Sequence, residues 1–151
     1  MKSSNIPRHV AIITDGNGRW AVQRGMPHSF GHKAGVGPIR DITQACLAAG
    51  VKILTWYVFS TENWSRDQEE VSFLMKLFTS FFKEWREEIS SNNIQMRHLG
   101  FKNNLPKELV QEIELTEAKT INNNGMVVNI ALNYGGKSEI VNATRIILND
   151  D

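Results

Sequence analysis

The chain has 151 residues, of which 41% are hydrophobic and 22% charged, a composition typical of one globular domain large enough to bury a core. A formal net charge of +1 excludes the global electrostatic field that many nucleic-acid-binding proteins use, and no nucleic-acid partner is expected. The one cysteine, Cys46, excludes an internal disulfide and fits a reducing compartment. We therefore expect a cytoplasmic protein, or a plastid protein if a transit peptide has been removed.

The first predicted element is a short apolar strand at residues 10–13, typical of a strand buried on both faces of a parallel sheet. A polar segment with two glycines, Gly16 and Gly18, follows it directly. In open α/β sheets ligands bind outside the carboxyl ends of the strands, so this segment is a candidate site. Asp15 could hold a metal or a proton, and Arg19 offers donors suited to phosphate. Asp-Gly and Asn-Gly are also the commonest turn dipeptides, so an ordinary turn is an equal interpretation.

Strands and helices then alternate along the chain. Residues 23–35 are predicted to form a loop or a broken helix, and Asp67 is a predicted helix cap. The predicted strands are 10–13, 51–59, 94–99 and 126–132, and the predicted helices are 38–50, 71–89, 105–121 and 140–148. This alternation predicts an α/β fold, a parallel sheet with helices on both faces. We expect one domain over residues 1–151, with the sheet apparently truncated after its fourth strand.

Polar segments also follow the second and the fourth predicted strands, at residues 60–66 and 133–136. Because the carboxyl ends of parallel strands meet at one edge of a sheet, these segments are expected to lie near the first one. The three segments together therefore predict a cleft and not an isolated turn.

In this order the motifs resemble the cis-prenyltransferase family, typified by undecaprenyl diphosphate synthase. The resembling segments are HVAIITDGNGRWA (9–21), GHKAG (31–35), FSTENWSR (59–66) and NIALNYGGKSEIV (129–141). They cover nearly the whole chain with the family's spacing, which makes the resemblance more specific than a single glycine turn.

The resemblance implies a magnesium-dependent transferase that joins an allylic diphosphate to isopentenyl diphosphate with a cis double bond. It implies that Asp15 is catalytic and is the Mg²⁺ ligand, and that Asn63 is catalytic through deprotonation and substrate positioning. The substrate-binding residues that it implies are Gly16, Asn17, Gly18, Arg19, Trp20, His32, Ser60, Trp64, Arg66 and Glu70. It also implies a homodimer and leaves room for peripheral association with a membrane.

Structural roles remain open for several of these positions. His32 could brace a loop, and Trp64 could be a core residue. Asn133 and Tyr134 could form a simple turn, and we expect them to support the floor of the cleft.

An aromatic stripe on the predicted helix at 71–89 has two interpretations. Such stripes usually pack into a core, but in the resembling family the matching helix forms one wall of the product tunnel. Phe73, Phe81 and Phe82, with Val58 on the neighbouring strand, are bulky for a long tunnel. We therefore expect a short product of about ten to fifteen carbons, because an overfilled wall excludes chain volume.

The sequence departs from the family pattern in three places. His28 stands where long-chain members commonly have an arginine, and Thr14 stands where a methionine is usual. The family's C-terminal segment, with its isopentenyl diphosphate motif, a further acidic metal ligand and dimer contacts, is absent from this sequence.

Three functional hypotheses stay open. The chain could be part of an ordinary two-substrate synthase, or a noncatalytic diphosphate-binding subunit. It could also couple two dimethylallyl diphosphates irregularly, as lavandulyl-type synthases of this fold do. A dinucleotide-binding domain is disfavoured, because the segment Gly16-Asn17-Gly18 lacks the GxGxxG spacing.

Overall fold

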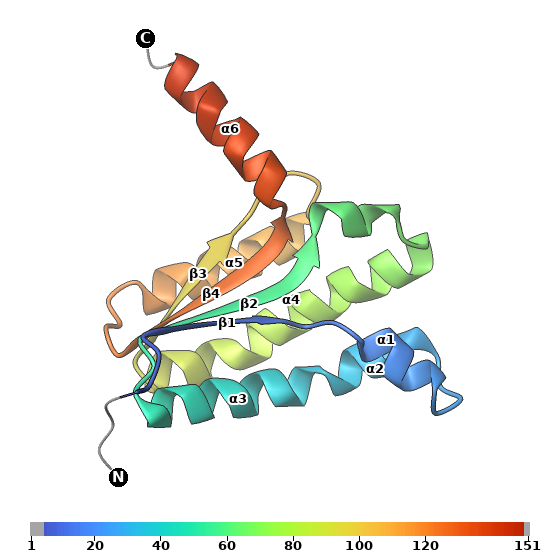
Figure 1. The fold of residues 1–151 in the computed structure, drawn as a ribbon, viewed down its shortest axis with the longest axis horizontal. Helices are drawn as coiled ribbons and strands as arrows, with labels where there is room; N and C mark the ends of the chain where they lie inside the picture. Colours follow the sequence, from blue (N-terminus) through green and yellow to red (C-terminus); the bar gives the residue numbers. More distant parts are fainter. Residues whose placement is uncertain (1–4, 150–151) are drawn as a thin grey trace.

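A computed structural model describes residues 5–149 of the chain. Four parallel strands form one sheet in the order β1-β2-β4-β3 (Figure 1). The strands are β1 (His9–Ile13), β2 (Ile53–Ser60), β3 (Ile94–Leu99) and β4 (Met126–Tyr134). This parallel α/β architecture confirms the predicted fold class.

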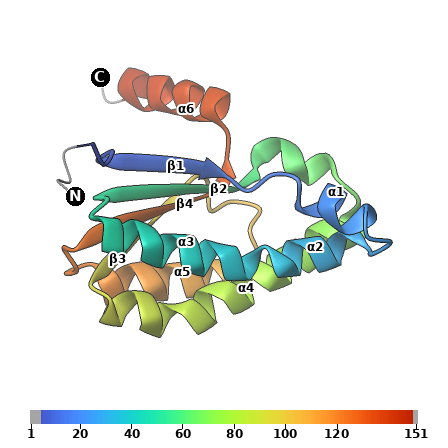
Figure 2. The ribbon, with the colours of Figure 1, turned by 60° about the horizontal axis from the view of Figure 1, so that its bottom comes forward.

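Helices α3, α4 and α5 cover one face of the sheet, and α6 lies on the opposite side (Figure 2). The helices are α1 (Asn17–Val22), α2 (His28–Ala34), α3 (Val36–Ala49), α4 (Gln68–Ser91), α5 (Lys107–Thr120) and α6 (Gly136–Asn149), and a 3₁₀ helix, η1, spans Thr61–Ser65. Within residues 5–149 no helix combines the length and the apolar character that crossing a membrane requires.

The core lies between the sheet and helices α3–α5. Its largest fully buried side chains include Trp56 and Leu54 of β2, and Trp85 and Phe82 of α4. The Trp56 Nε1 donates a hydrogen bond to Thr43 Oγ1 of α3 at 3.1 Å, so the polar atom of the largest core residue has a partner inside the core.

Strand β1 differs from its prediction. It lies at the edge of the sheet and its side chains alternate between exposed and half-buried, with Ile13 74% exposed. The expectation of a strand buried on both faces is therefore wrong, because the face opposite α3–α5 is open at this edge. The apolar composition of residues 10–13 does not distinguish an edge strand from a central one.

Several boundaries shift by a few residues. The segment 23–35, predicted as a loop or broken helix, contains α2, and α1 precedes it; α6 begins at Gly136 rather than at residue 140. Asn133 and Tyr134 belong to β4 rather than to a separate turn, although Asn133 has a left-handed φ of 53°. The predicted cap of α4 is confirmed, because the Asp67 side chain accepts hydrogen bonds from two backbone amides of the first turn.

Candidate functional site

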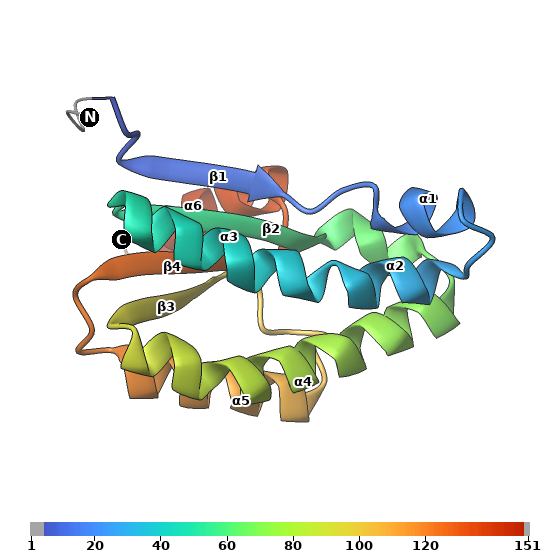
Figure 3. The same ribbon diagram turned by 90° about the horizontal axis from the view of Figure 1, so that it is seen from below.

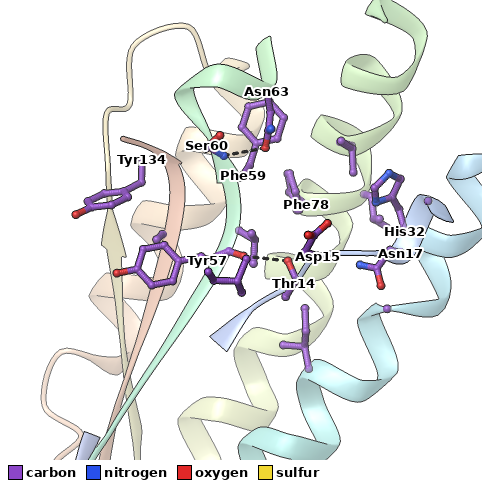
Figure 4. Close-up of a pocket in the computed structure, with 18 of the residues that line it drawn as sticks. Thr14, Asp15, Asn17, His32, Tyr57, Phe59, Ser60, Asn63, Phe78 and Tyr134 are labelled. Atoms are coloured by element: carbon purple, nitrogen blue, oxygen red, sulfur yellow. Dashed lines mark hydrogen bonds between the residues drawn. The ribbon is translucent and has the colours of Figure 1, made fainter. Parts of the chain in front are cut away.

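A cavity of about 660 Å³ opens at the carboxyl ends of β1 and β2 (Figure 4). Both polar and apolar side chains line it. The polar lining residues include Asp15, Asn17, Arg19, His28, His32, Ser60, Asn63, Arg66 and Glu70, with Gly16 and Gly18 beside them. The apolar lining residues include Val58, Phe59, Leu74, Leu77, Phe78, Phe81 and Phe82. A lining of both kinds suits a ligand with a charged head and a hydrocarbon tail.

Asp15 and Arg19 form an ion pair in the cavity lining. The Gly16 backbone N–H donates to Asp15 Oδ1 at 2.6 Å, and Arg19 Nη2 donates to Asp15 Oδ2 at 2.9 Å. Gly16 has a left-handed φ of 88°, which lets the chain turn from β1 into α1. The Gly16 hydrogen bond, followed by Arg19, holds the pKa of Asp15 below its usual value. Both side chains are about three-quarters exposed, so an ionised carboxylate and a guanidinium are open to a ligand.

Glu70 of α4 joins three elements around the cavity. Its Oε1 accepts hydrogen bonds from His32 Nε2 of α2 at 2.9 Å and from Arg66 Nη1 at 3.1 Å, and His28 Nδ1 lies 3.7 Å from its Oε2. Burial raises the pKa of Glu70, but the hydrogen bonds from His32 and Arg66 outweigh it, so this pKa lies below its usual value. Glu70 therefore orients His32 and Arg66 as an ionised acceptor.

Asn63 is held at the end of β2 by the cap of η1. Its Oδ1 accepts a hydrogen bond from the Ser60 backbone N–H at 3.0 Å, and the Ser60 side chain accepts reciprocally from the Asn63 backbone. This reciprocal cap fixes the Asn63 side chain in the cavity wall, on a different element from Asp15. The structure thus brings both predicted catalytic residues to one cavity.

The glycines of the GHKAG segment bring α2 against Asn17. A Cβ on Gly31 would lie 1.9 Å from the Asn17 carbonyl oxygen, and a Cβ on Gly35 would lie 2.9 Å from Asn17 Nδ2. Gly31 leaves no room for a side chain, because the atom that blocks it belongs to backbone, whereas a side chain at residue 35 would have to displace the Asn17 side chain. This contact places Asn17 and His32 in the same wall of the cavity.

Two predicted binding residues lie outside the described cavity lining. Trp20 is 40% exposed, stacks on Phe30 with ring centroids 6.3 Å apart, and carries the Arg24 guanidinium 4.3 Å above its ring. Trp64 donates from Nε1 to Asn133 Oδ1 at 2.8 Å. The structure therefore places Trp64 behind the wall as a brace and Trp20 on the outer surface.

Asn133 and Tyr134 have different roles at the end of β4. Asn133 is buried, and its Nδ2 donates to the carbonyl oxygens of Phe101 and Asn103 at 2.8 and 2.9 Å. Tyr134 lines the cavity, and its hydroxyl donates to Glu139 Oε2 at 2.6 Å. That hydrogen bond is the main reason the pKa of Tyr134 rises to about 12.

The aromatic residues of α4 that line the cavity differ from the expected set. Phe81, Phe82 and Val58 line the cavity as expected, but Phe73 does not, and Phe78 does. Phe81 and Phe82 are also core residues, so they belong to the core and line the cavity, and a product tunnel stays a prediction. The missed residues could have been found from the helical spacing that starts at Glu70, because positions four, seven, eight and eleven residues further along share its face, and these are Leu74, Leu77, Phe78 and Phe81.

Magnesium is the cofactor that the resemblance implies, and the cavity residues include possible ligands for it. Within residues 5–149 no three His, Cys, Asp or Glu side chains lie close enough together to hold a metal. Mg²⁺ is commonly held by one or two carboxylates together with substrate phosphates and waters. The exposed, ionised Asp15 beside Arg19 fits a Mg²⁺ ion that is shared with a phosphate-bearing ligand.

Comparisons with known proteins point to one family. The Prenyltransf family model, which describes undecaprenyl diphosphate synthase, matches residues 13–151. Isoprenyl transferases of Clostridium tetani and Fusobacterium nucleatum are 48% and 50% identical to this chain over 97% of its length. The chain spans 57% and 64% of the length of these two curated relatives.

Two crystal structures share the fold. One is lavandulyl diphosphate synthase from Lavandula x intermedia in complex with dimethylallyl diphosphate, with a TM-score of 0.91 and 36% identity over 95% of this chain and 61% of that one. The other is a probable undecaprenyl diphosphate synthase from Campylobacter jejuni, with a TM-score of 0.79 and 27% identity over 97% of this chain and 63% of that one.

Proposed function

This chain belongs to the undecaprenyl diphosphate synthase family of prenyltransferases, and we propose that it carries the allylic diphosphate site of a magnesium-dependent cis-prenyltransferase. The reaction joins an allylic diphosphate to isopentenyl diphosphate. The observation that carries the proposal is the exposed Asp15–Arg19 ion pair in a cavity that apolar side chains also line. A diphosphate head would lie against the pair, and its prenyl tail would lie along the apolar lining residues.

In this proposal the chain's own groups stabilise the leaving diphosphate. Arg19 donates to the diphosphate oxygens from a planar, permanently charged group. The backbone at Gly16 and Gly18 can approach the same oxygens closely because no side chain intervenes. Asp15 would hold a Mg²⁺ ion, which when bound would neutralise further negative charge on the diphosphate. Such charge stabilisation favours cleavage of the allylic C–O bond.

The remaining polar residues are assigned to substrate positioning and proton transfer. Asn63 would position isopentenyl diphosphate so that, as the new C–C bond forms, the proton it loses passes to the released diphosphate. His32 and Arg66, oriented by Glu70, bind on the same side of the cavity. Trp64 contributes by bracing η1 against Asn133.

A short product, of about ten to fifteen carbons, is part of the proposal. Phe78, Phe81 and Phe82 line the cavity, and Phe81 and Phe82 are buried in the core, so they cannot swing aside without disturbing it. A homodimer and a cytoplasmic location stay predictions.

Irregular coupling of two dimethylallyl diphosphates is the second candidate. The close likeness to lavandulyl diphosphate synthase, with a TM-score of 0.91, favours it. His28 is also compatible with it, since a histidine in place of the long-chain family's arginine is a weaker diphosphate contact near neutral pH. The higher identity to isoprenyl transferases favours the first candidate.

Product analysis separates the candidates. The chain is incubated with Mg²⁺ and labelled dimethylallyl diphosphate, with and without isopentenyl diphosphate. Product only with both substrates supports regular elongation, and product from dimethylallyl diphosphate alone supports irregular coupling. A folded chain that binds dimethylallyl diphosphate but forms no product supports a noncatalytic module. An Asp15→Ala variant with full activity would refute the role of Asp15.

A further inference from the structure

Helices α1 and α2, with the loop between them, form one end of the molecule (Figure 1 and Figure 3). This end, the α1–α2 tip, comprises α1, α2 and the loop between them, with the apolar side chains Trp20, Val22, Met26 and Phe30 and the basic side chains Arg24 and Lys33. Its four apolar side chains are all exposed, from 38% at Met26 to 55% at Val22. Four large apolar side chains are thus exposed within eleven residues. Exposed apolar surface of this kind is typical of an interaction site.

The contacts within the tip have the character of an interfacial surface. The Trp20 and Phe30 rings stack nearly parallel, and the Arg24 guanidinium lies over the Trp20 ring while Nη1 donates to the Trp20 carbonyl oxygen at 3.1 Å. An aromatic pair with a cation at its edge presents apolar area and positive charge together. Trp side chains and snorkelling Arg side chains suit the boundary between lipid headgroups and acyl chains.

The positive charge around the tip indicates which kind of partner would bind there. Residues 16–40 contain four Arg or Lys residues and no Asp or Glu, whereas the whole chain has a net charge of only +1. Arg19 pairs with Asp15, and Arg40 pairs with Glu84. Arg24 and Lys33 therefore carry the excess positive charge of the tip, which is complementary to an anionic surface.

We propose that the α1–α2 tip is a docking surface for an anionic lipid bilayer. Trp20, Val22, Met26 and Phe30 enter the headgroup region, and Arg24 and Lys33 contact anionic headgroups. The same two helices supply Gly18, Arg19 and His28 to the cavity wall, so docking brings the exposed Asp15–Arg19 pair beside the bilayer. The proposal does not depend on the chemistry assigned to the cavity.

Vesicle flotation without any substrate tests the proposal. Vesicles of phosphatidylcholine with phosphatidylglycerol should carry the protein, and vesicles of phosphatidylcholine alone should carry much less. The variant Val22→Glu/Met26→Glu should reduce binding to the anionic vesicles by about tenfold or more. The matched control Leu115→Glu/Ile121→Glu changes two exposed apolar residues of another surface and should bind as the wild type does.

A second comparison tests the role of charge. The variant Arg24→Gln/Lys33→Gln removes two positive charges from the tip, and the control Lys107→Gln/Lys83→Gln removes two elsewhere. Only the first pair should weaken binding, and high salt should weaken the wild type similarly. Unchanged binding of Val22→Glu/Met26→Glu, or an equal loss in the Leu115→Glu/Ile121→Glu control, would overturn the proposal. So would wild-type protein that ignores vesicles but self-associates through the tip, with a molar mass that falls in the tip variant.

Discussion

Gly31 approaches the Asn17 carbonyl oxygen so closely that a Cβ at this position would lie only 1.9 Å from it. The oxygen belongs to backbone, which cannot swing aside as the end of a long side chain can. The packing of α2 on α1, and with it the position of Asn17 in the cavity wall, therefore depends on the absence of a side chain at residue 31.

Gly31→Ala should destabilise the protein. The added methyl must push α2 away from α1, which costs about 1–3 kcal/mol of the free energy of unfolding. Urea unfolding measures the change. Gly136→Ala, at the first residue of α6, is the matched control: a Cβ there meets nothing within 4 Å, so the free energy of unfolding should change by less than about 0.5 kcal/mol. Equal stability of the two variants would contradict the close contact.

Glu70→Gln should remove part of the protein's acid sensitivity. The pKa of Glu70 is lowered in the folded state, so the unfolded state binds more protons as the pH falls. The stabilisation is present above the unfolded pKa, near the ordinary value of 4.5, and is lost as the pH falls through the folded pKa.

Glu70→Gln should therefore lower stability at neutral pH by about 1–3 kcal/mol and flatten the decline below the unfolded pKa. Unfolding measured across a pH series gives both quantities. The neighbouring exposed Glu69 serves as control, and Glu69→Gln should keep the wild-type slope. An unchanged slope in Glu70→Gln would count against the His32 and Arg66 hydrogen bonds.

Tyr134 should titrate at an unusually high pH. The sequence has two tyrosines, so in a Tyr57→Phe variant the tyrosinate absorbance reports Tyr134 alone. Its midpoint should lie at about 12, mainly because the hydroxyl donates to Glu139. A raised pKa stabilises the fold below the unfolded value, near 10.0, and this stabilisation is lost as the pH rises to about 12. Glu139→Gln should bring the midpoint back toward the ordinary value, and a midpoint that was already ordinary would argue against the hydrogen bond.

Product length should change when Phe78 or Phe81 is shortened, but not when Phe73 is. Phe78→Ala or Phe81→Ala opens space beside the prenyl tail, so longer products are expected. Phe73→Ala removes the same number of atoms from a position on α4 outside the cavity lining and should leave the product distribution unchanged. Chromatography of the dephosphorylated products makes the comparison. A shift in Phe73→Ala equal to that in Phe81→Ala would show that cavity volume is not the cause.

The sequence predicts the elements and the site better than it predicts burial. Asp67 is a correct cap because its carboxylate satisfies backbone amides of its own helix, which is a local interaction. Ile13 is exposed although its strand is apolar, because exposure depends on what covers the sheet, and that is set by distant parts of a chain.

At the cavity, too, some residues can be predicted from the order of the strands, whereas others depend on tertiary packing. Asp15 and Asn63 follow strands that end at the same edge, so topology alone brings them to one cavity. Trp20 lies one residue after Arg19, yet it faces outward. The direction of a side chain on a six-residue helix depends on how that helix packs, and a motif does not specify it.

Calorimetric titration of dimethylallyl diphosphate in the presence of Mg²⁺ tests the central claim most directly. The wild type should bind, and Arg19→Gln should weaken the affinity by about tenfold or more, since a charge-assisted contact is worth at least ~1.4 kcal/mol. The fold should be unaffected, because the Asp15–Arg19 pair is exposed. Arg97→Gln, on β3 and outside the cavity lining, should bind as the wild type does. Wild-type affinity in Arg19→Gln would contradict the assignment of this cavity wall to the diphosphate.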